Sequence, residues 1–167
     1  MRQAVMIVLS LVVCACAVPP PRPVQRQFQW EPEEHTAYLG PGPAAIRGQG
    51  FLRQQGGGTV SCAGSDVWLL PGTPYFDESL RILATRDVDS IEGALWAVFG
   101  RYMRKSQCDG QGNFTFRDLP SLPWIVTTDV RWVVGYRSQG GRLVKLVTAV
   151  PGDTPPSLLS DRDLWSR

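Results

Sequence analysis

The chain alternates apolar and polar side chains over residues 124–136, and this run limits the choice of fold more than any other segment. One face of the run carries Trp124, Val126, Val130, Trp132, Val134 and Tyr136, and the other carries Thr127, Asp129, Arg131 and Arg137. Successive side chains of a strand point to opposite sides of a sheet, so a period of two gathers the apolar groups on one side. The run predicts a long antiparallel strand with one buried and one solvent-facing side.

Shorter runs of the same kind predict further strands, separated by turns. We expect strands over residues 46–53, 59–62, 66–70 and 143–150, with glycine-rich turns at 56–58 and 139–141. Pro71-Gly72-Thr73-Pro74 is expected to end the strand of residues 66–70. In the third of these strands, Val67 and Leu69 share one face while Trp68 and Leu70 share the other. The chain has 17 glycines and 14 prolines among 167 residues. This density of turn formers favours short strands joined by loops over a helical bundle.

One segment has helical rather than strand periodicity. Its apolar side chains Ile91, Leu95, Phe99 and Tyr102 are spaced by four, four and three residues, which places them on one stripe of a helix over residues 88–105. We expect this amphipathic helix to pack on a sheet as a single insertion. A helix lying on a membrane surface is the alternative interpretation.

Residues 1–15 have the features of an export signal. Arg2 supplies positive charge, and the apolar run after it has about ten residues, half of the ~20 that a membrane-spanning helix needs. Residues 13–16, Val-Cys-Ala-Cys, resemble the lipobox of bacterial lipoproteins, whose cysteine receives diacylglycerol and becomes the mature N-terminus. Lipidation is therefore predicted at Cys16, and Ala17 after it favours the outer over the inner membrane.

A different cleavage remains open for the same segment. Ala15-Cys16-Ala17 fits the small-x-small pattern of ordinary signal peptidase, which would release a soluble protein beginning near Val18. Cys14 is a weaker candidate for lipidation because the bulky Val13 stands before it.

The segments on either side of the predicted strands differ from them in composition. Residues 16–45 contain closely spaced prolines, which favour extended conformations, and we interpret them as a tether between membrane and domain. Phe28, Trp30 and Tyr38 are candidates for docking part of the tether, and His35 is expected to be solvated. The domain is expected over residues 46–150. A polar tail over 151–167 follows, with a short docked helix as one interpretation of its apolar residues.

The four cysteines divide into two pairs. Cys14 and Cys16 belong to the leader, which leaves Cys62 and Cys108 in the body of an exported chain. An oxidising compartment predicts a disulfide between these two, with buried free thiols as the alternative. Two isolated cysteines and a single histidine form no ligand cluster, so neither a metal nor another cofactor is predicted.

Three stretches of the sequence resemble the carboxypeptidase regulatory-like domain. They are Ile46-x-Gly48, Ala63-Gly64-x-Asp66-Val67-x-Leu69 and Asp109-Gly110-x-Gly112-x-Phe114-x-Phe116-x-x-Leu119-Pro120. The resemblance implies a mainly β fold, a Greek-key prealbumin-like β-sandwich of about seven strands, into which the helix of residues 88–105 is inserted. Members of that family have structural and binding roles without catalytic residues, so the resemblance implies a protein that is not an enzyme.

The motifs of the sequence also favour a protein that is not an enzyme. The chain has no motif of nucleophilic, metalloprotease or phosphate-binding sites. A net charge of +2 is too small for a nucleic-acid surface. Asp109 and Asn113 suggest a calcium loop only weakly, since the ligand series of an EF-hand is missing. Trp124 and Trp132 fall on the apolar face, which leaves Trp68 and Trp30 as candidate ligand-contact residues.

The sequence thus predicts a non-catalytic bacterial envelope lipoprotein. It would present a β-sandwich binding or assembly module in the periplasm or at the cell surface, held to the membrane through its lipid anchor. Its partner would be an envelope protein or a glycan. The alternative is a secreted carbohydrate-binding or enzyme-accessory module, released by ordinary signal peptidase.

Overall fold

The computed structural model describes residues 25–84, 91–153 and 155–165. The predicted leader, the predicted lipidation site at Cys16 and the predicted start of the helix at residue 88 lie outside the described residues. The elements, in chain order, are α1 (Pro32–Thr36), β1 (Ala44–Arg53), β2 (Thr59–Ser61), β3 (Asp66–Pro71), α2 (Pro74–Ala84), α3 (Ile91–Phe99), the 3-10 helix η1 (Gly100–Tyr102), β4 (Arg104–Gln107), β5 (Asn113–Leu119), β6 (Pro123–Val134), β7 (Arg137–Thr148), β8 (Gly152–Asp153), β9 (Ser157–Leu159) and the 3-10 helix η2 (Asp161–Asp163).

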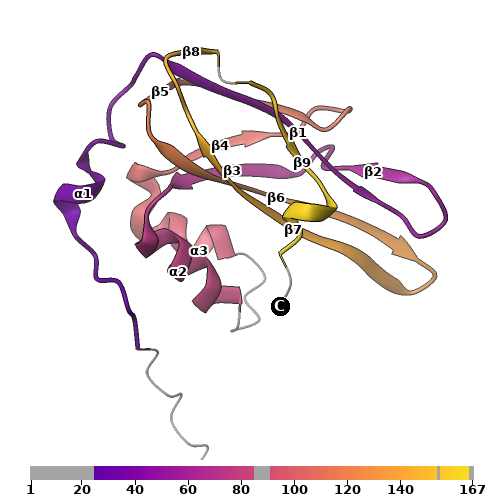
Figure 1. The fold of residues 1–167 in the computed structure, drawn as a ribbon. Helices are drawn as coiled ribbons and strands as arrows, with labels where there is room; N and C mark the ends of the chain where they lie inside the picture. The colour runs from indigo at the N-terminus through magenta and orange to yellow at the C-terminus, as the bar shows by residue number, and fades with distance from the viewer. Residues whose placement is uncertain (1–24, 85–90, 154, 166–167) are drawn as a thin grey trace, which may run out of the picture.

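The strands form two sheets that pack against each other (Figure 1). One sheet has the order β4-β3-β6-β7, with every neighbouring pair antiparallel. The other is built around β1, which pairs antiparallel with β2 and β5 and parallel with β8 and β9. The prediction of a mainly β fold is confirmed in this form.

The main hydrophobic core lies between the two sheets. The sheet built around β1 contributes Ile46, Leu52, Phe114, Phe116, Leu119 and Leu159, and the four-stranded sheet contributes Val67, Leu69, Trp124, Val126, Val130, Leu143 and Val147. Trp124 is the largest fully buried side chain of this core. The predicted alternation of β3 is confirmed, because Val67 and Leu69 face this core while Trp68 and Leu70 point to the other side of the sheet.

The outer side of the four-stranded sheet is partly covered by α2 and α3 (Figure 1). Between this side of the sheet and the two helices lies a second hydrophobic core, which consists of Leu70, Tyr75, Phe76, Leu80, Leu95, Met103 and Ile125. The molecule therefore has three layers over this part of its area, namely sheet, sheet and helices.

The expectation of one inserted helix is wrong, because two helices cross this face. Helix α2 was not predicted, although Phe76 and Leu80 stand four residues apart, as in an amphipathic helix. Pro74 had been interpreted as the end of the preceding strand. It instead begins α2, where its missing N–H costs nothing and its fixed φ suits the first helical turn.

The helix predicted over residues 88–105 ends earlier than expected. Helix α3 stops at Phe99, η1 adds one tighter turn, and Met103 is already extended, with φ −102° and ψ 163°. Arg104 and Lys105 then pair with Leu69 and Trp68 as part of β4. Backbone pairing with the edge of β3 therefore overrides the preference of two basic residues for a helix C-terminus.

The described part of the tether predicted over residues 16–45 packs on the domain from residue 26 onward. The backbone N–H groups of Gln27 and Phe28 donate to the Glu78 carboxylate on α2, at 2.6 and 3.0 Å. Arg26 donates to Ser79 Oγ at 2.9 Å. The predicted docking of Tyr38 is confirmed, because its side chain is buried in the main core.

His35 is fully buried, so the expectation of a solvated side chain is also wrong. Its Nδ1 lies 2.8 Å from the carbonyl oxygen of Glu31, and its Nε2 lies 2.9 Å from Thr73 Oγ1. Both ring nitrogens are therefore hydrogen-bonded, as a buried imidazole requires. The histidine fixes α1 to the loop between β3 and α2.

The hairpin of β6 and β7 turns at Gly135 and Tyr136 rather than at residues 139–141. Gly135 has φ +61°, which suits the first position of a two-residue hairpin turn. Gly140 lies within β7 with φ +91°, and a Cβ there would meet the carbonyl oxygen of Val130. This glycine permits a close approach of two strands, which the sequence does not distinguish from a turn.

The C-terminal segment is docked as a strand rather than a helix. Strand β9 runs parallel to β1, with Gly48, Gln49 and Gly50 opposite Ser157, Leu158 and Leu159. A Cβ at Gly48 would meet the Ser157 carbonyl oxygen and the Phe114 ring. The small residue of the Ile46-x-Gly48 stretch thus lets β9 lie close to β1.

Candidate ligand-binding surface

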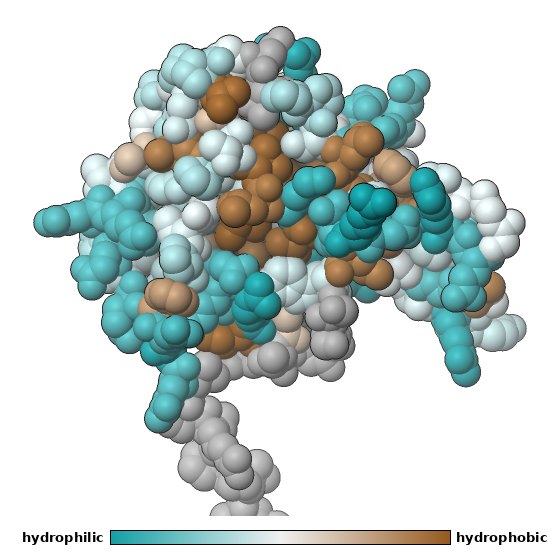
Figure 2. Space-filling model, viewed as in Figure 1, coloured by the Kyte–Doolittle hydropathy of each residue, from teal (hydrophilic) through white to brown (hydrophobic). Residues whose placement is uncertain are grey.

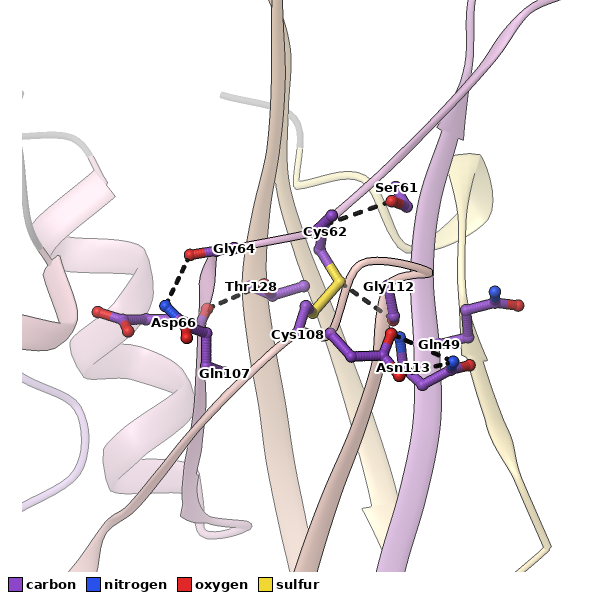
Figure 3. Close-up of a disulfide and its surroundings, with 12 residues drawn as sticks. Gln49, Ser61, Cys62, Gly64, Asp66, Gln107, Cys108, Gly112, Asn113 and Thr128 are labelled. Atoms are coloured by element: carbon purple, nitrogen blue, oxygen red, sulfur yellow. Dashed lines mark hydrogen bonds between the residues drawn. A yellow bond between two sulfur atoms is a disulfide. The ribbon is translucent and has the colours of Figure 1, made fainter.

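A disulfide joins two of the points where the chain crosses between the sheets, one between β2 and β3 and the other between β4 and β5. The bond links Cys62, after β2, with Cys108, between β4 and β5, and its Cα atoms lie 5.8 Å apart (Figure 3). Cys62 N donates to Gly50 O at 2.9 Å and Cys108 N donates to Ser65 O at 3.0 Å, which ties both cysteines to neighbouring backbone. The predicted Cys62–Cys108 disulfide is confirmed.

The turn that follows Cys108 is closed by a carboxylate. Asp109 Oδ1 accepts from the backbone N–H groups of Gln111 and Asn113, at 2.9 and 2.8 Å, and the Asn113 side chain donates to both carboxylate oxygens. The Asn113 side-chain hydrogen bonds, followed by those from the two backbone N–H groups, lower the pKa of Asp109. This carboxylate serves the turn, as aspartates in turns commonly do. Among the described residues no group of three or more His, Cys, Asp or Glu is placed to hold a metal ion.

The structure places Trp30 in a packed aromatic cluster. Its ring stacks on His35 with centroids 4.1 Å apart and also contacts Tyr75, Phe99 and Tyr102, with centroids 5.2, 4.6 and 5.1 Å away. These contacts hold the N-terminal segment against α2, α3 and η1. Trp30 is therefore half-buried, and its ring packs against other aromatic side chains.

Trp68 lies at the margin of the helical layer and meets a second tryptophan. The ring of Trp96, on α3, has its centroid 5.2 Å from that of Trp68, and the two planes are inclined by 59°. Trp68 is half-buried, whereas Trp96 is 43% exposed. Lys105 Nζ lies 5.0 Å from the Trp68 centroid and pairs with Asp66 at 2.8 Å. We call Asp66, Trp68, Trp96 and Lys105 the tryptophan surface.

Charged side chains continue on the same side of the sheet. Asp129 on β6 pairs with Arg131 at 3.2 Å and with Arg142 of β7 at 3.0 Å. The strand register places Trp68 opposite Thr127, so Asp129, two residues along, points to the same side of β6. The part of the outer side that α2 and α3 do not cover thus carries polar groups. They extend from the tryptophan surface to Asp129 and its partners on β6 and β7.

Exposed apolar side chains occur elsewhere too, as Figure 2 shows for one face, where brown residues remain visible among teal ones. The large exposed ones are Phe28, Trp96, Val98, Val133, Val134, Tyr136, Leu146, Val150, Leu158 and Leu164. Trp96 differs from the others in having a second indole and a Lys–Asp ion pair beside it. An exposed aromatic face next to hydrogen-bonding groups is suited to a ligand that has both apolar and hydroxyl surfaces.

Trp96 was not among the residues singled out from the sequence. It directly follows Leu95 of the apolar stripe, so it stands on the flank of α3, and only the pairing of β4 with β3 shows that Trp68 lies beside it. The sequence feature that could have indicated Trp96 is its position directly beside the apolar stripe of a short helix. None of the helices in the described part of the chain is both long and apolar enough to span a bilayer.

Comparisons with known proteins give a likeness of fold. No family model matches the chain, and no curated protein matches it. One solved structure to which it is similar is a candidate carbohydrate-binding protein from Pseudomonas aeruginosa, with a TM-score of 0.62 and 24% identity. The match covers 81% of this chain and 98% of that one. At this identity the likeness establishes the fold.

Proposed function

We propose that the protein is a non-catalytic binding module of the bacterial cell envelope whose ligand is a glycan. The glycan binds on the tryptophan surface, with a sugar ring against Trp96 and its hydroxyls at Asp66 and Lys105. The observation that carries this proposal is the exposed Trp96 ring beside the Trp68 ring and the Lys105–Asp66 ion pair.

The chemistry of a sugar matches these groups. One side of a pyranose ring presents C–H groups, which pack on an aromatic face, while its rim presents hydroxyls that both donate and accept hydrogen bonds. The Asp66 carboxylate accepts and the Lys105 ammonium donates, and each is about half exposed, so both are within reach of a ligand. Lys105 also fixes the Trp68 ring, which supports Trp96 from beside it.

The structural neighbour supports a glycan over other ligands. Because a candidate carbohydrate-binding protein has a similar fold, we favour a glycan as the ligand over a peptide or a small anion. Because one fold serves many functions, the proposal depends on the tryptophan surface of this chain rather than on the likeness.

The place of the protein in the envelope belongs to the proposal as well. We propose that Cys16 is lipidated and that the chain belongs with the carboxypeptidase regulatory-like, prealbumin-like sandwiches that its motifs resemble. Incorporation of labelled palmitate that is lost in Cys16→Ser tests the anchor. A soluble mature protein beginning near Val18 would contradict it and would favour a secreted module with the same ligand.

The glycan proposal is tested by titrating the protein with neutral oligosaccharides and with purified peptidoglycan, followed by tryptophan fluorescence and co-sedimentation. Trp96→Ala should weaken binding by about tenfold or more, since it removes the apolar contact area of the sugar. Tyr136→Ala is the matched control, because this aromatic side chain is fully exposed at the β6–β7 turn. Absence of binding to every glycan, or an equal loss in Tyr136→Ala, would overturn the proposal.

A further inference from the structure

A groove of about 440 Å³ opens between the C-terminal half of β1, β7 and the segment of β9 and η2. None of its lining residues belongs to the tryptophan surface. Phe51 and Arg53 line it from β1, Lys145 from β7, and Leu158 and Arg162 from the C-terminal segment. Its volume falls within the range of small-molecule sites.

The two carboxylates of the groove are already engaged by the chain itself. Asp161 Oδ1 accepts from the backbone N–H of Arg53 at 3.2 Å. Asp163 Oδ2 accepts from the backbone N–H of Ser160 at 3.0 Å, and its Oδ1 lies 3.7 Å from Lys145 Nζ. These carboxylates therefore hold η2 against β1 and β7.

Lys145 is engaged as well, since its Nζ donates to the Leu158 carbonyl oxygen at 2.7 Å, but the two arginines of the groove differ. The side chains of Arg53 and Arg162 are exposed, and within residues 25–84, 91–153 and 155–165 neither guanidinium has a hydrogen-bond or ion-pair partner. A guanidinium presents planar pairs of N–H donors that match a carboxylate. The groove thus has donors for an anion that its own carboxylates do not occupy.

Apolar surface lies between these cations. Phe51 is half-buried in the wall, and Leu158, opposite Gln49 of β1, is 53% exposed. A bare inorganic anion would leave this surface and most of the volume unused. A ligand that fills the groove therefore combines a carboxylate with a ring that has apolar C–H faces.

We propose that this groove binds a uronic-acid residue, so that the glycan recognised by the protein is acidic. The carboxylate lies between Arg53 and Arg162, and the sugar ring packs against Phe51 and Leu158. This inference rests on the proposed glycan-binding function and adds to it the charge class of the ligand and a second contact surface.

The test compares methyl glucuronide with methyl glucoside by NMR titration of the full chain. We expect the glucuronide, and not the glucoside, to shift the backbone amides of Phe51 and of residues 160–163. Arg53→Ala and Arg162→Ala should each weaken its binding by about tenfold or more, the loss typical of a charge-assisted hydrogen bond. Arg117→Ala removes an exposed arginine from β5, outside the groove, and should leave binding unchanged.

Several results would overturn the inference. They are equal binding of inorganic phosphate and glucuronide, tighter binding of an acidic peptide in the groove, an equal loss in Arg117→Ala, or the absence of amide shifts at residues 160–163. Neutral oligosaccharides titrated into wild type and Trp96→Ala separate the two proposals. If these sugars bind at Trp96 while the glucuronide leaves the groove unshifted, the inference fails and the proposed function stands.

Discussion

The two sides of the four-stranded sheet are buried by different partners. The inner side packs against the second sheet, and the disulfide ties two of the crossings between the sheets together. The outer side is covered by α2 and α3 only in part, and the rest of it carries the tryptophan surface and the charges around Asp129. Stability is thus concentrated on one side of a sheet whose other side is open to a ligand.

Two adjacent leucines of β3 test the difference between the two sides of the sheet most directly. Leu69 faces the inner core and Leu70 faces the helices, and both are fully buried. Each change to alanine should lower the free energy of unfolding by about 2–5 kcal/mol, measured by chemical denaturation. We expect Leu69→Ala to cost more, because a cavity between two hydrogen-bonded sheets closes less readily than one beneath helices held by side chains. A larger loss in Leu70→Ala would contradict this difference.

The disulfide should have the next largest effect. The double change Cys62→Ala and Cys108→Ala opens a loop with a sequence separation of 46 residues and should cost about 2–4 kcal/mol. Denaturation of the oxidised protein and of the variant under equal conditions measures the difference. If the variant is as stable as the wild type, the strand pairing around the crossings is sufficient without the bond.

Acid should release the N-terminal segment from the outer layer. The backbone N–H groups of Gln27 and Phe28 lower the pKa of Glu78 by hydrogen bonding to its ionised form. The docking is therefore strongest above the ordinary pKa of a glutamate and is lost as the pH falls through the lower pKa of the folded state. The protection of the Phe28 amide against hydrogen exchange, taken relative to its intrinsic rate at each pH, should fall in that range, and Glu78→Gln should remove this pH dependence. An unchanged dependence in the variant would assign the effect to another group.

The smallest expected effect on stability concerns the tryptophan surface. Lys105 and Asp66 are each about half exposed, so Lys105→Ala should change the free energy of unfolding by less than about 1 kcal/mol. Glycan binding by the same variant should nevertheless fall, since a donor beside Trp96 is lost. A variant that loses stability and keeps full binding would reverse the roles that we assign to the two sides of the sheet.

The inner side of the sheet was the more predictable one from sequence. A period of two in residues 124–132 and 66–70 indicates which side chains face the core, and the two cysteines in the body of a chain expected to be exported predict the disulfide. The outer side depends on contacts between distant segments, which no local pattern contains. Trp96 and Trp68 meet because β4 returns the chain to β3, and His35 is buried because Thr73 offers it a partner.

The elements that differ from the sequence-based predictions do so for a common physical reason. Pro74 and Gly140 were interpreted as turn or boundary residues, yet proline also begins helices and glycine also permits two backbones to approach. The acidic and proline-containing stretch around His35 has the composition of a spacer. It packs nevertheless, because Trp30 supplies apolar area to the layer of α2 and α3, and Tyr38 supplies it to the core between the sheets.

The parallel pairing of β9 with β1 also determines how the molecule responds to mechanical force. Strand β1 follows the docked N-terminal segment, β9 precedes η2 at the other end of the fold, and the two strands point the same way. A force that pulls the two ends of the domain apart therefore loads the hydrogen bonds at Gly48 and Gly50 together, in shear, rather than peeling them one after another. Beyond that point the Cys62–Cys108 bond keeps the intervening loop from adding length, so the extension of the stretched chain is limited as well.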